Sequence, residues 1–143
     1  WMQIAIQEAI KAEKEGEVPV GAVLVKDGLL IAKAHNQPIS KNDATAHAEI
    51  QLVRIAGKEL QNYRLNGSTL FVTLEPCAMC FGAMVHARIE RIVYGAHDLK
   101  TGVCGSSEDL TNANCFKHKI NITGGVSESK CGQLLQTFFK SRR

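Results

Sequence analysis

Two short motifs constrain the fold more than any other feature of this sequence, because both carry residues that bind metal ions. The first is Thr45-Ala46-His47-Ala48-Glu49 and the second is Pro76-Cys77-Ala78-Met79-Cys80. One histidine and two cysteines can hold a zinc ion but cannot complete its tetrahedron, and a zinc ion with three protein ligands keeps its fourth position for water. The two motifs therefore predict a fold that brings remote segments together around a catalytic metal.

Glu49 follows His47 by two residues, and residues two apart point to different sides of a regular helix. We therefore expect His47 to bind the metal at the start of a helix, with Glu49 beside the metal-bound water as a proton-carrying carboxylate. Cys77 and Cys80 are spaced to share one face at the N-terminus of the next helix. There the helix dipole and the zinc ion both lower the pKa of a thiol.

Two other interpretations of these motifs remain open at this point. A single Cys-x-x-Cys can be a dithiol redox motif, but that interpretation leaves His47 and Glu49 without a role. A closed structural zinc site would need a fourth ligand at close spacing, and the sequence has no second Cys-x-x-Cys. The joint occurrence of the two motifs favours the catalytic metal.

The composition is that of an ordinary globular protein, 45% hydrophobic and 22% charged. A length of 143 residues predicts a single domain, residues 1–143, that buries enough surface to fold without disulfides. Five cysteines is an odd number, and the three outside the motif lack framework spacing, so we expect a reducing, cytoplasmic location. No apolar run approaches a membrane span, and the net charge of +3 is too small to identify a partner.

The order of the predicted elements indicates an α/β protein. A helix over residues 2–15 precedes a hairpin in which Val20–Lys26 and Leu29–Ala34 flank the turn Asp27-Gly28. A polar loop then leads to a helix over residues 46–57, which we expect to bury Ile50 and Val53. The remaining predictions are a polar loop over 58–67, a strand over 68–73, a helix with Pro76 in its first turn, a strand over 91–96, a long loop, a strand over 120–123, and a final helix that begins at Ser127 or Ser129. This order predicts one sheet with helices on both faces, a three-layer α/β/α sandwich.

With both motifs in place, the chain resembles the zinc-dependent cytidine/deoxycytidylate deaminase superfamily, and within it the bacterial branch that acts on adenosine in tRNA. The segments that carry the closer resemblance span the chain: Glu17–Val23, Asn36–Ile39, Thr45–Ile50, Asn62–Arg64, Thr73–Cys80, Asp98–Gly102 and Phe138–Arg143. The resemblance implies a cytidine deaminase-like, five-stranded mixed sheet, one Zn²⁺ per chain and a homodimer. The chain departs from the family mainly in the loop 103–119, which contains Cys104 and Cys115.

The resemblance also implies an activity, the hydrolytic deamination of adenosine to inosine at the wobble position of a tRNA anticodon loop. His47, Cys77 and Cys80 would hold a zinc ion that lowers the pKa of its water. Glu49 would be the catalytic residue, which carries protons from that water to the base and then to the departing ammonia.

Two residues match positions that line the base pocket in this family. Asn36 matches a base-reading asparagine, whose amide offers both a donor and an acceptor, and Val18 matches an apolar wall. Without the resemblance, Asn36 would be interpreted as a turn residue that bonds its own backbone. Val18 would be interpreted as an ordinary core residue.

Two further groups of residues match RNA-contacting positions. Asp98, Lys100 and Thr101 match a loop that contacts the nucleotides flanking the target, although the residues alone would be interpreted as a polar turn. A C-terminal group matches the surface that meets the anticodon stem-loop, where aromatic rings stack on bases and arginines contact phosphates. Its members are Phe138, Arg142 and Arg143.

Two rival functions come from these considerations. One is a deaminase of a free base or nucleotide such as guanine or deoxycytidylate, which would have no use for the aromatic and basic C-terminus. The other is a non-catalytic module that binds tRNA or is stabilised by zinc, which would have no use for Glu49.

Overall fold

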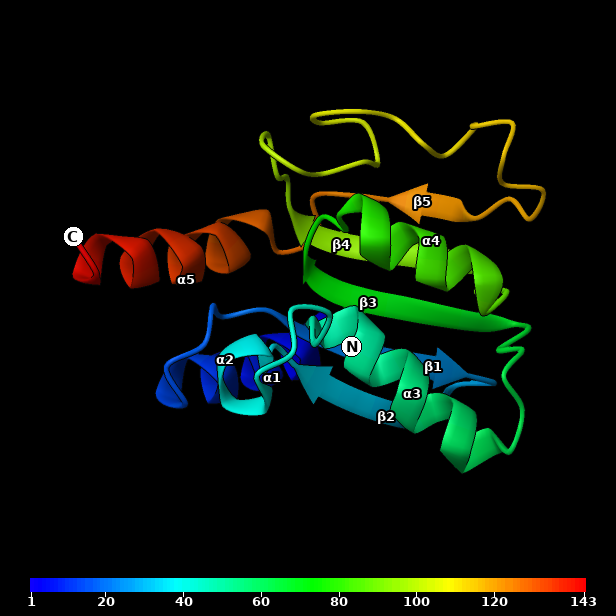
Figure 1. The fold of residues 1–143 in the computed structure, drawn as a ribbon, viewed down its shortest axis with the longest axis horizontal. Helices are drawn as coiled ribbons and strands as arrows, with labels where there is room; N and C mark the ends of the chain where they lie inside the picture. Colours follow the sequence, from blue (N-terminus) through cyan, green and yellow to red (C-terminus); the bar gives the residue numbers. More distant parts are fainter.

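The computed structural model describes residues 1–143, and its centre is a five-stranded mixed sheet with the strand order β2-β1-β3-β4-β5 (Figure 1). The strands are β1 (Gly21–Lys26), β2 (Leu29–His35), β3 (Ser68–Leu74), β4 (Arg91–Ala96) and β5 (Asn121–Thr123). The helices are α1 (Met2–Lys14), α2 (Pro38–Lys41), α3 (Ala48–Leu60), α4 (Ala78–His86) and α5 (Glu128–Ser141). None of these helices combines the length and the apolar character that crossing a membrane requires.

The first two strands form the predicted hairpin. Lys26 pairs with Leu29, so the connection between β1 and β2 consists of two residues. Both of them have positive φ, 53° at Asp27 and 73° at Gly28. A turn with positive φ at both central positions matches the right-handed twist of the flanking strands. The Asp-Gly pair therefore sets the register next to the turn, and the register shifts by one residue between Val25 and Leu24. The predicted hairpin is confirmed.

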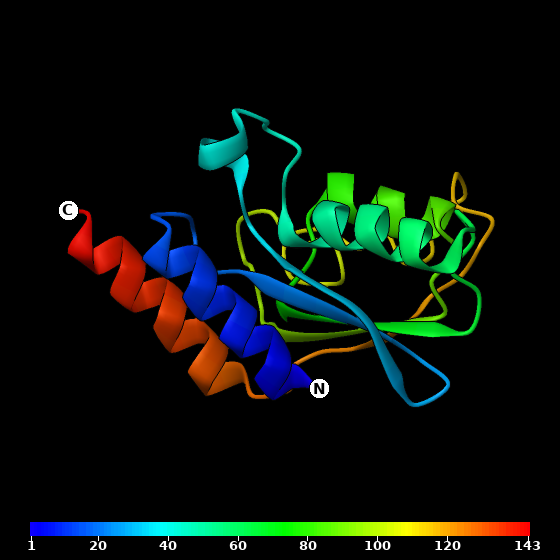
Figure 2. The ribbon, with the colours of Figure 1, turned by 90° about the horizontal axis from the view of Figure 1, so that it is seen from below.

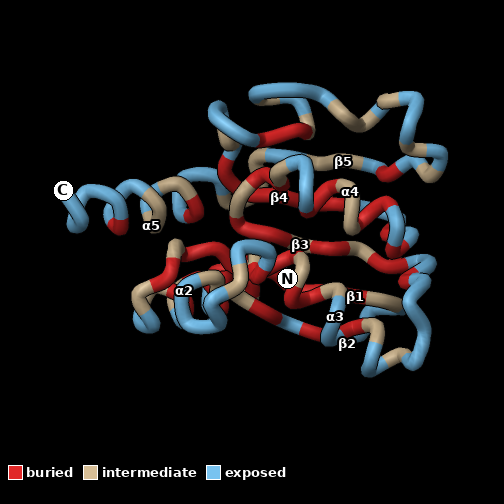
Figure 3. Tube along the Cα trace, in the orientation of Figure 1, coloured by how far each residue is buried: buried red, intermediate tan, exposed pale blue.

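Strand β1 is buried on both faces, which explains its nearly continuous apolar sequence. Side chains alternate across a strand, so Ala22 and Leu24 join the core cluster beneath α3 and α4. Val23 and Val25 join the second cluster, which contains residues of α1 and α5. Figure 3 shows the same concentration of buried residues in the central strands.

Helices cover both faces of the sheet, as Figure 2 shows: α3 and α4 lie on one face, and α1 and α5 lie side by side on the other. The helix α1 packs very closely on β1 at Gly21. A Cβ atom at this position would overlap the backbone of Ala5 and Ala9. The predicted three-layer α/β/α sandwich is confirmed.

One edge of the sheet collects the segments that carry the candidate site. β1 is antiparallel to both β2 and β3, whereas β3 and β4 are parallel. The strands β2, β3 and β4 therefore all end at the edge where β1 begins, and α4 supplies the crossover that the parallel pair needs. The segments at this edge contain Val18, Asn36, Cys77 and Asp98. We call it the site edge.

Three element boundaries differ from the prediction. The predicted loop after residue 57 begins later, because α3 continues to Leu60 and ends at Gln61 with a φ of 51°. The loop before α3 contains the short helix α2, with a proline in its first turn. Pro76 precedes α4 instead of lying in its first turn, because Cys77 is the N-cap.

The buried stripe of α3 also differs from the prediction. Ile50 and Val53 are only half-buried against the core. The fully buried positions on the sheet-facing side are Ala48, Leu52 and Ala56. They are four residues apart and two of them are alanines, so α3 lies close to the sheet with its larger branched residues at the side.

Candidate zinc centre and active site

The three metal-binding side chains meet where α3 and α4 begin. His47 is the N-cap of α3 with an extended backbone (φ −68°, ψ 156°), and Cys77 is the N-cap of α4 (φ −81°, ψ 174°). Cys80 lies in the first turn of α4. The ligand atoms of these residues all lie within 4.8 Å of one another. The structure thus brings together the three residues that the two motifs singled out.

The spacing of these atoms fits a zinc ion. The Nδ1 atom of His47 lies 3.7 Å from the sulfur of Cys77 and 3.5 Å from the sulfur of Cys80. Tetrahedral zinc with bonds of about 2.3 Å to sulfur and about 2.05 Å to nitrogen separates such a pair of atoms by about 3.6 Å. These distances fit His47, Cys77 and Cys80 as the residues that would hold one zinc ion, and three protein ligands would keep a position for water.

The two thiols differ in their pKa values. The pKa of Cys77 is lowered to about 4, mainly because the Cys80 thiol donates a hydrogen bond to it and His47 adds a second. The same bond raises the pKa of Cys80, which keeps its proton, and burial adds to this rise. The thiolate is the form that binds zinc, and a bound dication deprotonates a coordinating thiol.

Glu49 lies next to the ligands but is not one of them. It is in the first turn of α3, only 4% exposed, and one carboxylate oxygen lies 3.4 Å from the sulfur of Cys80. Because His47 precedes the helix in an extended conformation, residues two apart can both reach the site. Burial raises the pKa of Glu49 to about 7. A carboxyl group that exchanges its proton near neutral pH is suited to general acid–base catalysis.

Asn36 directly follows β2, and its side chain caps α3 from outside the helix. Its Oδ1 atom accepts a hydrogen bond of 2.7 Å from the backbone N–H of Ala48, a group that the N-cap side chain of His47 leaves unpaired. An N–H group requires an acceptor, so this contact fixes the orientation of the amide. The NH₂ group of Asn36 remains as a donor toward a substrate, and Oδ1 keeps a second lone pair.

This double role predicts different effects for two substitutions. Asn36→Asp keeps the oxygen that accepts from Ala48 and loses the amide donor, so we expect an unchanged melting temperature and strongly impaired deamination. Asn36→Ala loses both groups, and we expect it also to lower the free energy of unfolding by about 1–2 kcal/mol, the usual effect of removing a cap. Thermal melts and steady-state kinetics of both variants test this. An equal loss of stability in both variants would contradict the assigned orientation.

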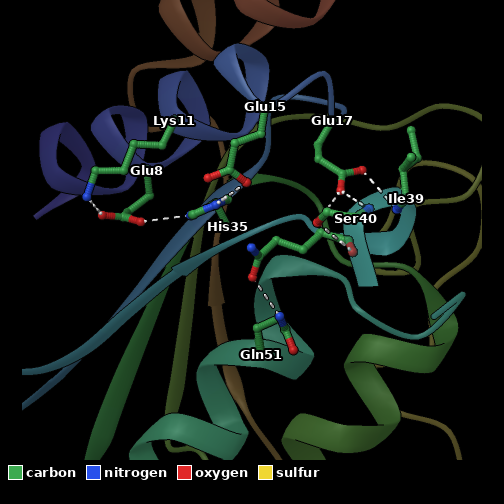
Figure 4. A network of polar contacts seen from close by, with 9 residues as sticks. Glu8, Lys11, Glu15, Glu17, His35, Ile39, Ser40 and Gln51 are labelled. Atoms are coloured by element: carbon green, nitrogen blue, oxygen red, sulfur yellow. Dashed lines mark hydrogen bonds and ion pairs between the residues drawn. The ribbon is translucent and has the colours of Figure 1, made fainter. Parts of the chain in front are cut away.

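A buried glutamate holds the segment that follows Asn36. The carboxylate of Glu17, in a residue only 1% exposed, accepts three hydrogen bonds of 3.0 Å, from the backbone of Ile39 and from the backbone and hydroxyl of Ser40 (Figure 4). Burial raises the pKa of Glu17, but the bonds from Ser40 and Ile39 outweigh it, so the pKa is lowered overall. Val18, the next residue, is half-buried against the core. The role of Glu17 has no local signal in the sequence, because its hydrogen-bond donors lie more than 20 residues away.

The end of β2 is held from the other side by His35. Its two ring nitrogens lie 3.1 Å from a carboxylate oxygen of Glu8 and 3.0 Å from one of Glu15, both from the α1 segment (Figure 4). Lys11 forms a further ion pair with Glu8 at 2.7 Å. These contacts attach the end of β2, the strand that precedes Asn36, to α1 on the other face of the sheet.

Asp98 folds its own loop. One carboxylate oxygen accepts from the backbone N–H groups of Lys100 and Thr101 at 3.0 and 3.1 Å, and the other accepts from the Thr101 hydroxyl at 2.8 Å. The side chains of Asp98 and Thr101 are therefore engaged with each other, as the polar-turn interpretation expected. Lys100 is exposed.

The C-terminal residues pack against the end of α1. Phe138 is only 5% exposed, and the guanidinium of Arg142 lies over its ring, 4.3 Å from the centroid. Arg142 also donates a 3.4 Å hydrogen bond to the carbonyl of Gly16. Arg143 is exposed, and the exposed aromatic residue of α5 is Phe139, at 51%. Phe138, which the resemblance assigns to the RNA-contacting surface, is thus buried, and its neighbour Phe139 is exposed.

A three-ligand zinc centre beside a buried glutamate, at one edge of a mixed sheet between helices, defines a zinc-dependent deaminase of the cytidine deaminase fold. Comparison with known families agrees, because residues 1–96 match the model of the cytidine and deoxycytidylate deaminase zinc-binding region. The match contains every candidate metal ligand and Glu49. The fold and the zinc cofactor that the resemblance implied are thereby confirmed.

Comparison with individual proteins identifies the family within this class of deaminases. The chain is 50% identical to a tRNA-specific adenosine deaminase of Haemophilus influenzae, covering 99% of this chain and 83% of the relative. It is 47% identical to that of Bacillus subtilis, covering 100% and 89%. A solved structure from work on A-to-I editing by tRNA:A34 deaminases at the wobble position of transfer RNA superposes with a TM-score of 0.89 at 42% identity, covering 94% of this chain and 97% of the other. The chain belongs to the family of tRNA-specific adenosine deaminases.

Proposed function

We propose that this protein is a zinc-dependent hydrolase that deaminates adenosine to inosine at the wobble position of a tRNA anticodon loop. The observation that carries the proposal is the arrangement of His47, Cys77 and Cys80 as three corners of a tetrahedron beside the buried carboxylate of Glu49. The full-length similarity to tRNA-specific adenosine deaminases supports adenosine in tRNA as the substrate.

The residues divide the reaction between them. When bound, zinc supplies a water molecule acidic enough to give hydroxide near neutral pH. Glu49 accepts a proton of that water and donates it to the ring nitrogen of the base, while the hydroxide forms a bond to the carbon that bears the amino group. Glu49 then takes the remaining proton of the added hydroxyl and delivers it to the amino group, which leaves as ammonia when its bond to that carbon breaks. Asn36 donates from its NH₂ group to an acceptor of the purine, and Val18 contributes an apolar wall. Because Glu49 is buried, bulk water does not compete for the proton that it transfers.

The RNA contacts lie around the site edge and along α5. Lys100 and Arg143 are exposed and free to contact phosphates. The guanidinium of Arg142 packs on the ring of Phe138, so Phe138 positions the charge of Arg142 for a phosphate contact. Phe139, exposed on the same helix, is better placed than Phe138 to stack on a base. Asp98 and Thr101 act by holding the shape of the loop that carries Lys100.

We infer further that the protein is a cytoplasmic homodimer. The dimer follows from the resemblance to the deaminase family. The location follows from the substrate and from the five free cysteines, which suit a reducing compartment.

The decisive experiment compares an anticodon stem-loop containing a wobble adenosine with free adenosine, guanine and deoxycytidylate. Turning a base out of the folded loop costs a few kcal/mol, roughly, which the protein recovers from contacts to the flanking RNA. A free nucleoside lacks these contacts, so we expect inosine from the stem-loop and little from adenosine. Mass spectrometry of the nucleosides measures the product. Equal turnover of free adenosine and stem-loop would favour the small-molecule deaminase instead.

A double substitution tests the C-terminal contacts in the same assay. Removing Arg142 and Arg143 together should weaken stem-loop binding and lower its salt dependence, because fewer phosphates are neutralised. We expect the log–log slope to fall by about 1–2. The matched control removes Lys26 and Arg91, two basic residues at the opposite edge of the sheet, and should change neither quantity. Zinc content should stay unchanged in all variants.

A further inference from the structure

Glu75 is a buried acid that neither binds the metal nor belongs to the expected RNA contacts. It follows β3 and precedes Pro76 and the ligand Cys77, and its side chain is completely buried. A buried carboxylate requires hydrogen-bond donors around it, because leaving its charge unpaired is costly. The donors of Glu75 therefore show which part of the molecule it serves.

All of these donors belong to one loop. One carboxylate oxygen accepts from the backbone N–H of Asp98 at 2.9 Å, and the other accepts from those of Cys104 and Ser106 at 2.9 and 3.1 Å. The ring of His97 lies 3.9 Å away. Backbone hydrogen bonds to both ends of the charged group are strong, so Glu75 fixes both arms of the loop 98–106 at once.

The loop is moulded around this carboxylate. Gly102 lies so close that a Cβ atom there would be 2.5 Å from the carboxyl carbon of Glu75 and 2.6 Å from one of its oxygens. The backbone beside Glu75 joins the same contact, since the carbonyl of Pro76 accepts from the N–H of Val103 at 3.0 Å. Glycine is thus required at position 102 for lack of space.

The same loop borders the active site. Val103 belongs to the core cluster that contains Cys80. Cys104 is partly buried and packs against the same cluster. Lys100 projects from the other end of the loop, where the proposed function places the flanking nucleotides.

From this geometry we propose that Glu75 is a positioning residue for substrate binding: it ties the loop 98–106 to the turn that carries Cys77, and so holds the RNA-contacting loop in register with the reacting centre. The inference rests on the proposed function for the nature of the substrate. Glu75 acts through the loop and touches no reacting atom, so its loss should affect KM for the stem-loop far more than kcat.

Two substitutions disrupt the contact between Glu75 and the loop 98–106, one in Glu75 and one in the loop. Glu75→Gln keeps the size of the side chain but replaces one accepting oxygen by a donor, which repels an N–H. Gly102→Ala leaves Glu75 intact and forces the loop away from it. We expect each variant to raise KM for the anticodon stem-loop by about tenfold or more, because the displaced loop loses contacts with the substrate, and a tenfold change corresponds to about 1.4 kcal/mol of binding free energy. The kcat value should change by less than about threefold, and zinc content should not change.

The control is Asp109→Asn, which disturbs a neighbouring turn of the same connection, where Asp109 accepts from Thr111. It should leave KM unchanged. A loss of kcat at constant KM in Glu75→Gln and Gly102→Ala, or a KM effect as large in Asp109→Asn, would overturn the proposal.

Amide hydrogen exchange of the zinc-loaded protein supplies a readout that does not depend on activity. In the wild type, we expect slow exchange at Asp98, Cys104 and Ser106, and in Glu75→Gln faster exchange at Asp98 at least. Unchanged protection of these amides in Glu75→Gln would refute the proposal that Glu75 holds the loop 98–106. If wild-type protein failed to deaminate the stem-loop, the proposed function and the substrate part of this inference would fall, while the exchange data would still decide whether Glu75 holds the loop.

Discussion

Glu49→Gln should bind zinc and RNA as the wild type does while its turnover falls about 100- to 10,000-fold, the usual contribution of a positioned acid–base group. Glutamine has the same shape but can neither accept nor deliver a proton, so only proton transfer is removed. Glu49→Ala should give the same loss of turnover. Glu59→Gln, an exposed substitution on the same helix α3, is the matched control and should be as active as the wild type.

The measurements are single-turnover kinetics with the stem-loop, zinc analysis and RNA titration. Burial of Glu49 and its distance of 3.4 Å from Cys80 make a structural contribution the main competing explanation. Loss of zinc along with activity in Glu49→Gln would establish that contribution. A loss of turnover smaller than about tenfold would count against the proton-carrying role.

Cys77→Ala or Cys80→Ala should abolish both zinc binding and deamination. With one of three ligands missing, the two remaining groups hold zinc too weakly to survive purification, and the metal should fall from about one per chain to nearly none. Since binding free energy of a structural or catalytic metal adds to the free energy of unfolding, the melting temperature should fall as well. Metal analysis of protein purified without chelators measures the effect.

Cys131→Ala provides the control for removing a buried thiol. Cys131 is 1% exposed but lies in the cluster on the other face of the sheet, away from the ligands. This variant should lose some stability through the smaller side chain and keep its zinc. Wild-type protein without zinc, or a Cys80→Ala variant with a full complement of zinc and activity, would remove the basis of the catalytic interpretation.

The parts of this protein that could be predicted from sequence are those with a local signal. The hairpin was evident because Asp27-Gly28 is a strong turn former between two apolar runs. The ligands were evident because His47-Ala48-Glu49 and the Cys-x-x-Cys segment combine residue types that suit zinc. The spacing of His47 and Glu49 also predicted that they differ in orientation, and the extended backbone of His47 nevertheless brings both side chains to the site.

The remaining features depend on contacts between distant segments. Nothing distinguishes Glu17 or Glu75 from exposed acids in the sequence, because their donors come from residues 39–40 and 98–106. The burial of Phe138 and the exposure of Phe139 depend on such a contact as well. Adjacent residues of a helix point in different directions, and only the docking of α5 beside α1 decides which ring is buried.

All candidate metal ligands lie at the site edge, and the opposite end of the strands carries none. The far end is made of the hairpin turn at Asp27-Gly28, the approach to β3 at Gly67 and the approach to β4, and none of these contributes a metal ligand. Exposed turns of this kind accept insertions and attached domains readily. A second protein inserted at the turn Asp27-Gly28 would therefore lie a full strand length from the zinc ligands. A nucleic-acid-binding domain inserted there could direct the enzyme to a chosen nucleic acid without contacting the active site.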